Sequence, residues 1–408
     1  MKTIKRFILS LSDAQKKSLL NLYVIFFVFF LISDCLDVFV PLYFVENNLS
    51  LIGLGIVQSL TLGLRFVFIL ILSKQKNQLR KWWLLLILIV NSSSILITVL
   101  WLSEYYFYFV MILLLATRSA INVVFNPAVA RLVTKENLGI GFGIRDIFLN
   151  LGSCIGLLLA GWLTIYHSQN IFIMFIFIGY IILMLLIWRF YSFYNKNNSD
   201  KTDEQEVQEE DKKGSFKQLF LSLVKKHKPD FYYICFSSCL ISLGMIVLSN
   251  YMPIYGNALN INANNIYILF SSSVFVTALL SLVGGIIIDK YSKKLLYQLY
   301  ILLCLISTAL LLPNSKALFV ISLILLSIRG VLDNIEQAYF FELNAEEDIE
   351  KLWAVLSMLN MFVSFAGPII LGYIIESSMR TALTVSITIL FVALLLSFGL
   401  EQKGKTIE

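Results

Sequence analysis

Charged and amide side chains interrupt several long apolar segments of this chain, and their spacing indicates what chemistry they can do. Asp34 and Asp37 lie three residues apart, so a helix places both carboxylates on one face. Arg118, Asn122 and Asn126 recur every four residues and form a polar stripe. A buried carboxylate can bind and release a proton, and a nearby arginine favours its charged form. These residues predict proton coupling; a structural ion pair, or a charge that only attracts cargo, is the alternative.

The same polar pattern returns about half a chain later, which indicates an internal duplication. The pairs at an offset of 211 residues are Arg118 with Arg329, Asn122 with Asp333, and Asn126 with Gln337. Glu336 lies beside this second stripe. At an offset of 212, the matching triplets are Pro41-Leu42-Tyr43 and Pro253-Ile254-Tyr255. Duplicated halves with a mobile interface are how many secondary transporters produce alternating access.

The elements that carry these residues are predicted to be membrane-spanning helices. Of the 408 residues, 58% are hydrophobic and only 14% are charged, against about a quarter in a soluble protein. The apolar residues form runs of about 20, long enough to cross a bilayer as helices. This composition excludes an ordinary soluble enzyme, a disulfide scaffold and a disordered chain. We predict helices at 19–45, 51–73, 82–102, 106–133, 139–166, 170–190, 231–257, 264–288, 294–313, 317–343, 351–376 and 379–400.

Lysine and arginine are distributed unevenly between the predicted loops. Most of the 32 lie in the tails, in the loops on the same side and in the segment 191–230, whereas the opposite loops hold Lys316 and Arg380. The positive-inside rule therefore predicts that both termini are cytoplasmic. The net charge of +6 then marks membrane topology, and no nucleic-acid partner is expected.

A charged segment at 191–230 separates the predicted halves, 1–190 and 231–408. Its acidic and basic runs predict a solvated cytoplasmic linker. Apolar residues at helical spacing beside lysines, from Phe216 to Lys226, predict a short helix at the membrane interface. A plain charged spacer is the alternative reading.

Catalytic and metal-binding chemistry finds no support in the remaining residues. The five cysteines all lie in apolar runs, so no disulfide framework is expected. His167 and His227 are far from any cysteine, and we expect no metal and no cofactor. Motifs of zinc proteases, serine hydrolases and phosphate loops are missing from the sequence. We therefore expect no enzyme, and active transport would use an ion gradient.

A short loop, Gly285-x-x-x-Asp289-Lys290-Tyr291-Ser292-Lys293-Lys294, joins the predicted helices 264–288 and 294–313. It is similar to the signature loop of the major facilitator superfamily, which the chain resembles over essentially its whole length. The equivalent loop 74–81 keeps the cations but lacks the glycine and the aspartate. The segments 118–128 and 152–161 resemble drug and macrolide exporters, although Leu157 stands where the exporter motif has proline.

The resemblance implies an all-α membrane protein of twelve transmembrane helices in two pseudo-symmetric six-helix halves. It places the first, fourth, seventh and tenth helices around a central cavity, where Asp34, Arg118 and Arg329 would lie roughly 16–18 Å deep. The expected proton-coupling residues are Asp34, Asp37, Arg118 and Asp333. The expected cavity residues are Arg65, Asn122, Asn126, Arg329, Glu336, Gln337, Tyr43 and Tyr255. The expected cytoplasmic gate consists of Gly285, Asp289, Lys290, Lys293, Lys294 and Arg131; solvated loop charges are the alternative.

The leading functional hypothesis is proton-coupled export of small amphipathic or drug-like compounds by alternating access. One alternative is a nutrient or metabolite importer of the same fold, and another is a membrane binding or sensor protein without turnover. The expected partners are a small-molecule substrate, protons and membrane lipids. We expect a multi-pass monomer in the cytoplasmic membrane.

Overall fold

The computed structural model describes residues 11–73, 77–100, 104–133, 138–166, 169–198, 229–332, 335–336, 339–340 and 349–400. All regular secondary structure in these ranges is helical. The first half contains α2 (Asp13–Glu46), α3 (Leu51–Ser73), α4 (Asn77–Leu100), α5 (Glu104–Leu132), α6 (Leu138–Tyr166) and α7 (Gln169–Asn198). The second half contains α10 (Pro229–Gly244), η3 (Val247–Tyr251), α11 (Met252–Ala258), α12 (Ala263–Lys290), α13 (Lys293–Ala309), α14 (Lys316–Gly330), α16 (Ile349–Phe365), α17 (Gly367–Ser377) and α18 (Met379–Phe398).

These helices confirm the all-α prediction. Among the described residues, nine helices are long and apolar enough to cross a membrane. The α4 segment Lys81–Ile97 is a shorter apolar helix, and α13 and α14 have 17 and 15 residues. The greater part of the predicted linker, 199–228, lies outside the residues that the structure describes.

Several helices differ from the prediction. The predicted helix 231–257 is divided into α10, η3 and α11, the predicted helix 351–376 is divided into α16 and α17, and α14 ends at Gly330 within the predicted helix 317–343.

Two other differences have a local reason. The helix α2 begins at Asp13 because Ser12 and Gln15 form a capping box. The helix α7 continues to Asn198, eight residues past the predicted end, and Phe190 and Tyr191 pack against Phe125 there. The spacing of apolar residues along the sequence did not predict the capping box or this aromatic packing.

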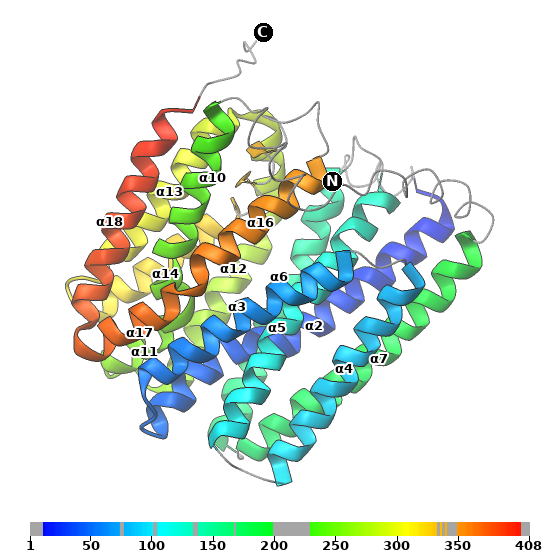
Figure 1. Ribbon diagram of the computed structural model, residues 1–408, viewed down its shortest axis with the longest axis horizontal. Helices are drawn as coiled ribbons and strands as arrows, with labels where there is room; N and C mark the ends of the chain where they lie inside the picture. Colours follow the sequence, from blue (N-terminus) through cyan, green and yellow to red (C-terminus); the bar gives the residue numbers. More distant parts are fainter. Residues whose placement is uncertain are drawn as a thin grey trace.

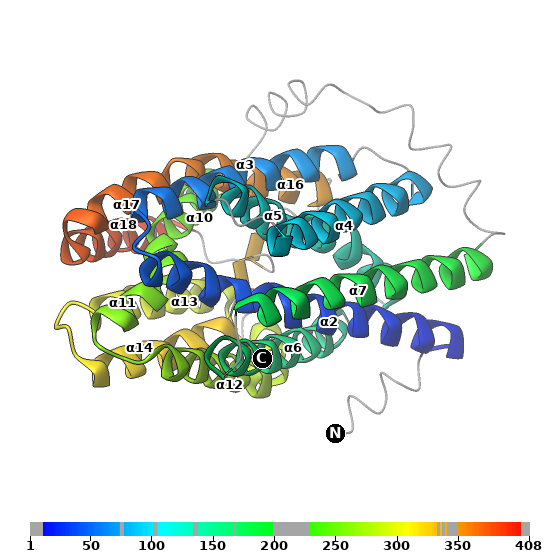
Figure 2. The same ribbon diagram turned by 90° about the horizontal axis from the view of Figure 1, so that it is seen from below.

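The two halves lie side by side along a common bundle (Figure 1). Figure 2 shows α3 beside α16 and α17 on one side of the bundle, and α6 beside α12 on the other. Within the first half, α2 packs against α3, α5, α6 and α7, and it also touches α11 of the second half. A polar side chain on α2 is therefore held inside the bundle.

Glycine allows α6 to approach α2 closely. A Cβ atom on Gly152 or Gly156 would overlap the backbone carbonyl oxygens of Phe27 and Leu31, respectively. These carbonyls belong to the α2 backbone, which cannot move aside as a flexible side chain would. The contact fixes the spacing between α2 and α6 beside Asp34.

We expect Gly156→Ala to destabilise the protein by about 1–3 kcal/mol, because the added methyl group forces the two helices apart. The matched control is Gly53→Ala, whose Cβ would meet Phe44 and Tyr108 atoms at 3.4 Å, an ordinary contact. The measurement is thermal unfolding of the purified protein in detergent. Equal melting temperatures for the two variants would contradict the close packing of α2 and α6.

Candidate functional site

A cluster of one arginine and two carboxylates lies in the interior of the first half. The Arg118 Nη1 atom is 2.9 Å from Asp37 Oδ2 and 3.2 Å from Asp34 Oδ1. The predicted spacing thus has its expected consequence, since both carboxylates project from one face of α2 toward α5. One guanidinium nitrogen connects both acids.

Arg118 occupies the middle of α5, roughly 21 Å from Glu104 and from Leu132 at 1.5 Å per residue. Its guanidinium also lies over the Phe30 ring, 4.9 Å from the centroid. A charge at this depth is costly in a membrane unless it is paired or reaches water. The two aspartates and the ring provide that stabilisation.

The two aspartates have different surroundings. Asp34 also accepts hydrogen bonds from the Ser33 hydroxyl, at 3.3 Å, and from the Ser153 hydroxyl on α6. Its side chain is 15% exposed, whereas that of Asp37 is 41% exposed. Asp37 lies on α2, which packs against α3, α5, α6 and α7. Asp34 is thus held by three donors, while Asp37 is the more accessible acid.

Arg65 lies next to this cluster without an ion pair to either aspartate. Its Nε and Nη2 atoms donate to the Leu115 carbonyl of α5, at 3.2 Å and 2.9 Å. It is close enough to Asp37 and Arg118 to act on both electrostatically. Two arginines and two ionised aspartates therefore sum to zero charge.

A second polar group lies nearer the start of α6. The Arg145 Nη1 atom donates to Asn126 Oδ1 at 2.9 Å, and its Nε donates to Asp146 at 2.8 Å. The Phe142 ring lies 4.7 Å from this guanidinium. Asn126 therefore connects α5 to α6, and Asn122 is half-buried one turn from Arg118.

The second half has its own polar contacts. The Arg329 Nη2 atom donates to the Tyr300 hydroxyl at 2.7 Å, and the guanidinium lies over the same ring. Glu336 accepts from the Ser238 hydroxyl, whose oxygen accepts from Asn360 Nδ2 at 2.7 Å. The expected coupling residue Asp333 and cavity residue Gln337 lie outside the described residues.

The two repeated tyrosines pack differently. Tyr43 stacks on Phe107, with centroids 4.2 Å apart. The Tyr255 hydroxyl donates to the Leu311 carbonyl and lies 3.0 Å from Asn314 Oδ1, so it holds α11 against the turn after α13. Tyr255 is buried by this contact.

Few of the expected gate residues have described side chains. Lys294 donates to the carbonyls of Phe398 and Leu400, which places a cation at the C-terminal end of α18. Lys293 is half-buried at the start of α13. The remaining gate residues, whose side chains the structure does not describe, are Gly285, Asp289, Lys290 and Arg131.

Sequence reasoning missed the serines that bind the carboxylates. Ser153 lies in a glycine-rich stretch and Ser238 in an apolar run, and neither residue type signals a site by itself. The usable signal was the position of Ser153 between Gly152 and Gly156. These glycines bring α6 close to α2, so a serine between them can reach a side chain of α2.

A model of the Major Facilitator Superfamily matches residues 22–234 and 234–406. The chain belongs to the major facilitator superfamily. Among solved structures of this fold, a bacterial homologue of the human lysosomal transporter Spinster, inward-facing and unoccupied, is 12% identical with a TM-score of 0.67, over 95% of this chain and 97% of that one. The nucleoside transporter NupG is 15% identical with a TM-score of 0.67, over 95% and 98%. No match was found among curated proteins.

The superfamily membership identifies a multi-pass membrane transporter and not an enzyme. It also confirms the major facilitator fold predicted from the loop and helix motifs. Identities this low carry the fold alone, so substrate and direction have to be argued from the charges in the bundle.

Ser153→Ala should destabilise the protein by about 1.5–3 kcal/mol, because it removes a hydrogen bond to a charged group inside the bundle. The matched control is Ser364→Ala at the duplicated position, where the buried hydroxyl has no hydrogen-bond partner among the described residues. Chemical or thermal unfolding in detergent compares the two. A larger loss of stability for the Ser364 variant would contradict the assignment of Ser153 to Asp34.

Proposed function

We propose that this protein is a proton-coupled exporter of small amphipathic cations. The observation that supports this is the sharing of one Arg118 nitrogen by Asp34 and Asp37 in the middle of the bundle. The same site could serve import if proton and cargo moved together. Export is favoured because a proton and a cationic cargo would compete for the same carboxylates.

Charge balance explains the competition. With both aspartates ionised, the cluster with Arg65 and Arg118 is neutral. Binding of either a proton or a monovalent cation gives it one positive charge, while binding of both gives two, which a low-dielectric interior strongly disfavours. Proton entry would therefore promote release of the cation, and this exchange is what antiport requires.

Asp37 is the acid that we assign to proton exchange. Its described hydrogen-bonding partner is Arg118 alone, and it is the more accessible of the two carboxylates. Asp34 is instead held by three groups, the Arg118 guanidinium and the Ser33 and Ser153 hydroxyls. Asp34 would thus keep Arg118 oriented while Asp37 changes its protonation state.

Alternating access would then arise from motion between the halves 1–190 and 231–408, joined by the linker 191–230. We propose cytoplasmic termini, which places the loop after α2 on the outside. At that end α3 and α17 form an outer contact. It comprises the Ser50 hydroxyl 3.3 Å from the Glu376 carboxylate, and Gly55 packed on the Pro368 carbonyl.

Gradient-driven flux in proteoliposomes tests the coupling scheme. Asp37→Asn should abolish transport of a cationic probe such as ethidium under an imposed pH gradient, because the amide cannot exchange a proton. Asp34→Asn should reduce transport, because Arg118 loses the carboxylate that orients it. Asp13→Asn, a fully exposed carboxylate on the same helix, should leave flux unchanged. Asp333→Asn tests the coupling residue predicted for the second half.

Three outcomes of this assay are informative in different ways. Flux unaffected by every interior neutralisation would contradict proton coupling through these acids. Transport in the direction of the proton flow would indicate import. Binding of the probe without gradient-driven flux would favour a binding protein.

Linking Ser50→Cys to Glu376→Cys with a short bifunctional thiol reagent should lock the outer contact. The linked double variant should lose at least about tenfold in flux, because the halves cannot separate at that end, and cleavage of the linker should restore it. Each single-cysteine variant treated with the same reagent is the control. Undiminished flux through protein shown by mass spectrometry to be linked would contradict the role of this contact.

A further inference from the structure

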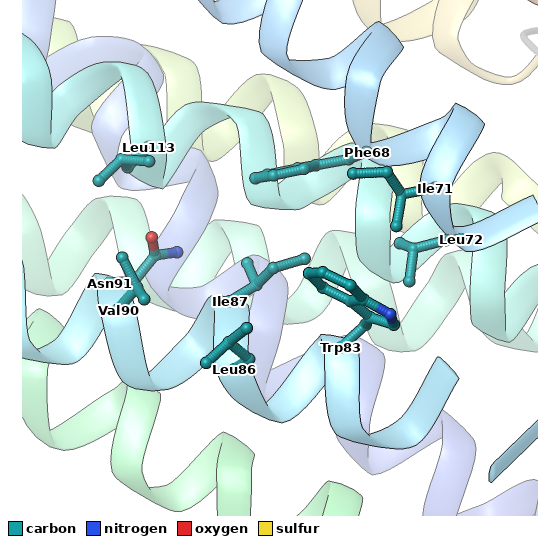
Figure 3. A pocket seen from close by; sticks show the side chains of 9 residues that line it. All are labelled: Phe68, Ile71, Leu72, Trp83, Leu86, Ile87, Val90, Asn91 and Leu113. Carbon is teal, nitrogen blue, oxygen red and sulfur yellow. The ribbon is translucent and has the colours of Figure 1, made fainter. Parts of the chain in front are cut away.

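One asparagine interrupts the apolar wall of a cavity between α3, α4 and α5. The cavity has a volume of about 190 Å³ and, apart from Asn91, is lined by hydrophobic side chains of these helices. Figure 3 shows Asn91 and Leu113 at the end of the cavity away from Trp83. A buried amide loses its hydration, so an apolar side chain of similar size would occupy this position at a lower cost. Packing alone therefore does not account for the amide.

Asn91 is bound to α5 at the residue directly before Arg118. It is 1% exposed, and its Nδ2 atom donates to the hydroxyl of the fully buried Thr117. That hydroxyl in turn donates to the Leu113 carbonyl of the same helix, at 3.0 Å. Because the second bond holds the Thr117 side chain against its own helix, the contact with Asn91 acts on the α5 backbone.

Three helices hold the same turn of α5. The Leu115 carbonyl accepts from Arg65 of α3. Thr117 accepts from Asn91 of α4, and Arg118 pairs with the two acids of α2. Successive residues of a helix project about 100° apart, so Thr117 and Arg118 face different helices. A contact that fixes the direction of Thr117 therefore also fixes the direction of Arg118.

The ion pairs tolerate little rotation of α5. A rotation of about 10° moves a point about 6 Å from the helix axis by about 1 Å. The Arg118 Nη1 atom lies 2.9 Å from Asp37 and 3.2 Å from Asp34, so a movement of this size breaks at least one of the two pairings. The cavity leaves Leu113 without close packing toward α4, which makes the hydrogen bond beside it a larger part of what resists rotation.

We propose that Asn91 is a positioning residue for Arg118, an inference that rests on the function proposed above. Its hydrogen bond to Thr117 sets the rotation of α5 at which one guanidinium nitrogen reaches both Asp34 and Asp37. Asn91 acts through α5 and not by contact with the acids. Loss of this bond moves Arg118 relative to the two carboxylates, so protons and cationic cargo compete for them at a different pH.

The charged groups that act on Asp37 come from three helices of the described part of the chain. They are Asp34 on α2 itself, Arg118 on α5 and Arg65 on α3. Of the other helices packed on α2, α6 has its charged pair Arg145–Asp146 beside Tyr23, and α7 has its charges at and beyond Arg189. An acid from which an arginine is withdrawn binds its proton at higher pH. The pH dependence of cation binding therefore reports the position of Arg118.

Ethidium binding to the purified full-length protein, followed by fluorescence as the pH is varied, tests the inference. The pH of half-maximal binding should rise by about 0.5–1 in Asn91→Leu and in Thr117→Val, which remove the hydrogen bond with little change in volume. Thr117→Ser keeps the hydroxyl and should bind as wild type does. Tyr106→Phe is the matched control, because it removes another hydrogen bond from α5 to α4, the one to the Ser94 carbonyl, about 18 Å along α5 from Arg118.

Thermal unfolding in detergent gives a second measurement that depends on neither cargo nor transport. The change in melting temperature caused by Asp37→Asn should be at least halved in the Asn91→Leu background, because the two substitutions act on the same ion pair. The Tyr106→Phe background should leave that change as it is in wild type. Thr117→Val takes the place of Asn91→Leu if the latter does not fold.

Two results would overturn the inference. One is a pH of half-maximal binding in Asn91→Leu and Thr117→Val that equals the value in Tyr106→Phe. The other is an effect of Asp37→Asn on the melting temperature that is equal in all backgrounds. Ethidium binding that does not depend on pH in wild type would instead contradict the function proposed above, and the melting temperatures would still decide the role of Asn91.

Discussion

The pairing of Arg118 with two aspartates constrains the whole first half, because charges in the middle of a bilayer are tolerated only with partners close by. The arginine comes from α5 and the acids from α2, so these helices must stay within reach of each other. Gly152 and Gly156 bring α6 close enough for Ser153 to reach Asp34. The packing of α6 on α2 and the hydrogen bond to Asp34 therefore depend on each other, and a substitution that alters one alters the other.

The duplication is unequal at this point. Both halves have an arginine in the fourth helix of the half, but the positions that match Asp34 and Asp37 at an offset of 212 are Ile246 and Ser249. They fall at and within the junction where α10 gives way to the π-helical η3, so the second half departs from regular helix where the first carries its acids. Such π segments are frequent at functional sites. In the second half, Arg329 donates a hydrogen bond to the Tyr300 hydroxyl.

The sequence predicted the helices, their duplication and the central ion pairs, because these depend on local periodicity and on the cost of burying charge. The spacing of Asp34 and Asp37 placed both on one face of a helix, and the resemblance to the superfamily placed that helix near the one that carries Arg118. It did not predict that Arg65 would bind the Leu115 carbonyl, or that Tyr255 would bind the turn after α13. Those contacts depend on how each helix is rotated against its neighbours, and residue spacing within one helix does not contain that information.

The helix α3 connects the charged cluster to the interface between the halves. Arg65 lies ten residues, about 15 Å, from Gly55, which packs on the Pro368 carbonyl of α17. Arg65 itself donates to the carbonyl of Leu115 on α5, three residues before Arg118. Under the mechanism that we propose, a change in the charge of Asp37 would alter the electrostatic force on Arg65, and α3 would transmit a resulting tilt to the contact with α17. Proton exchange in the first half would then act on the contact that joins it to the second half, without a charge having to cross between them.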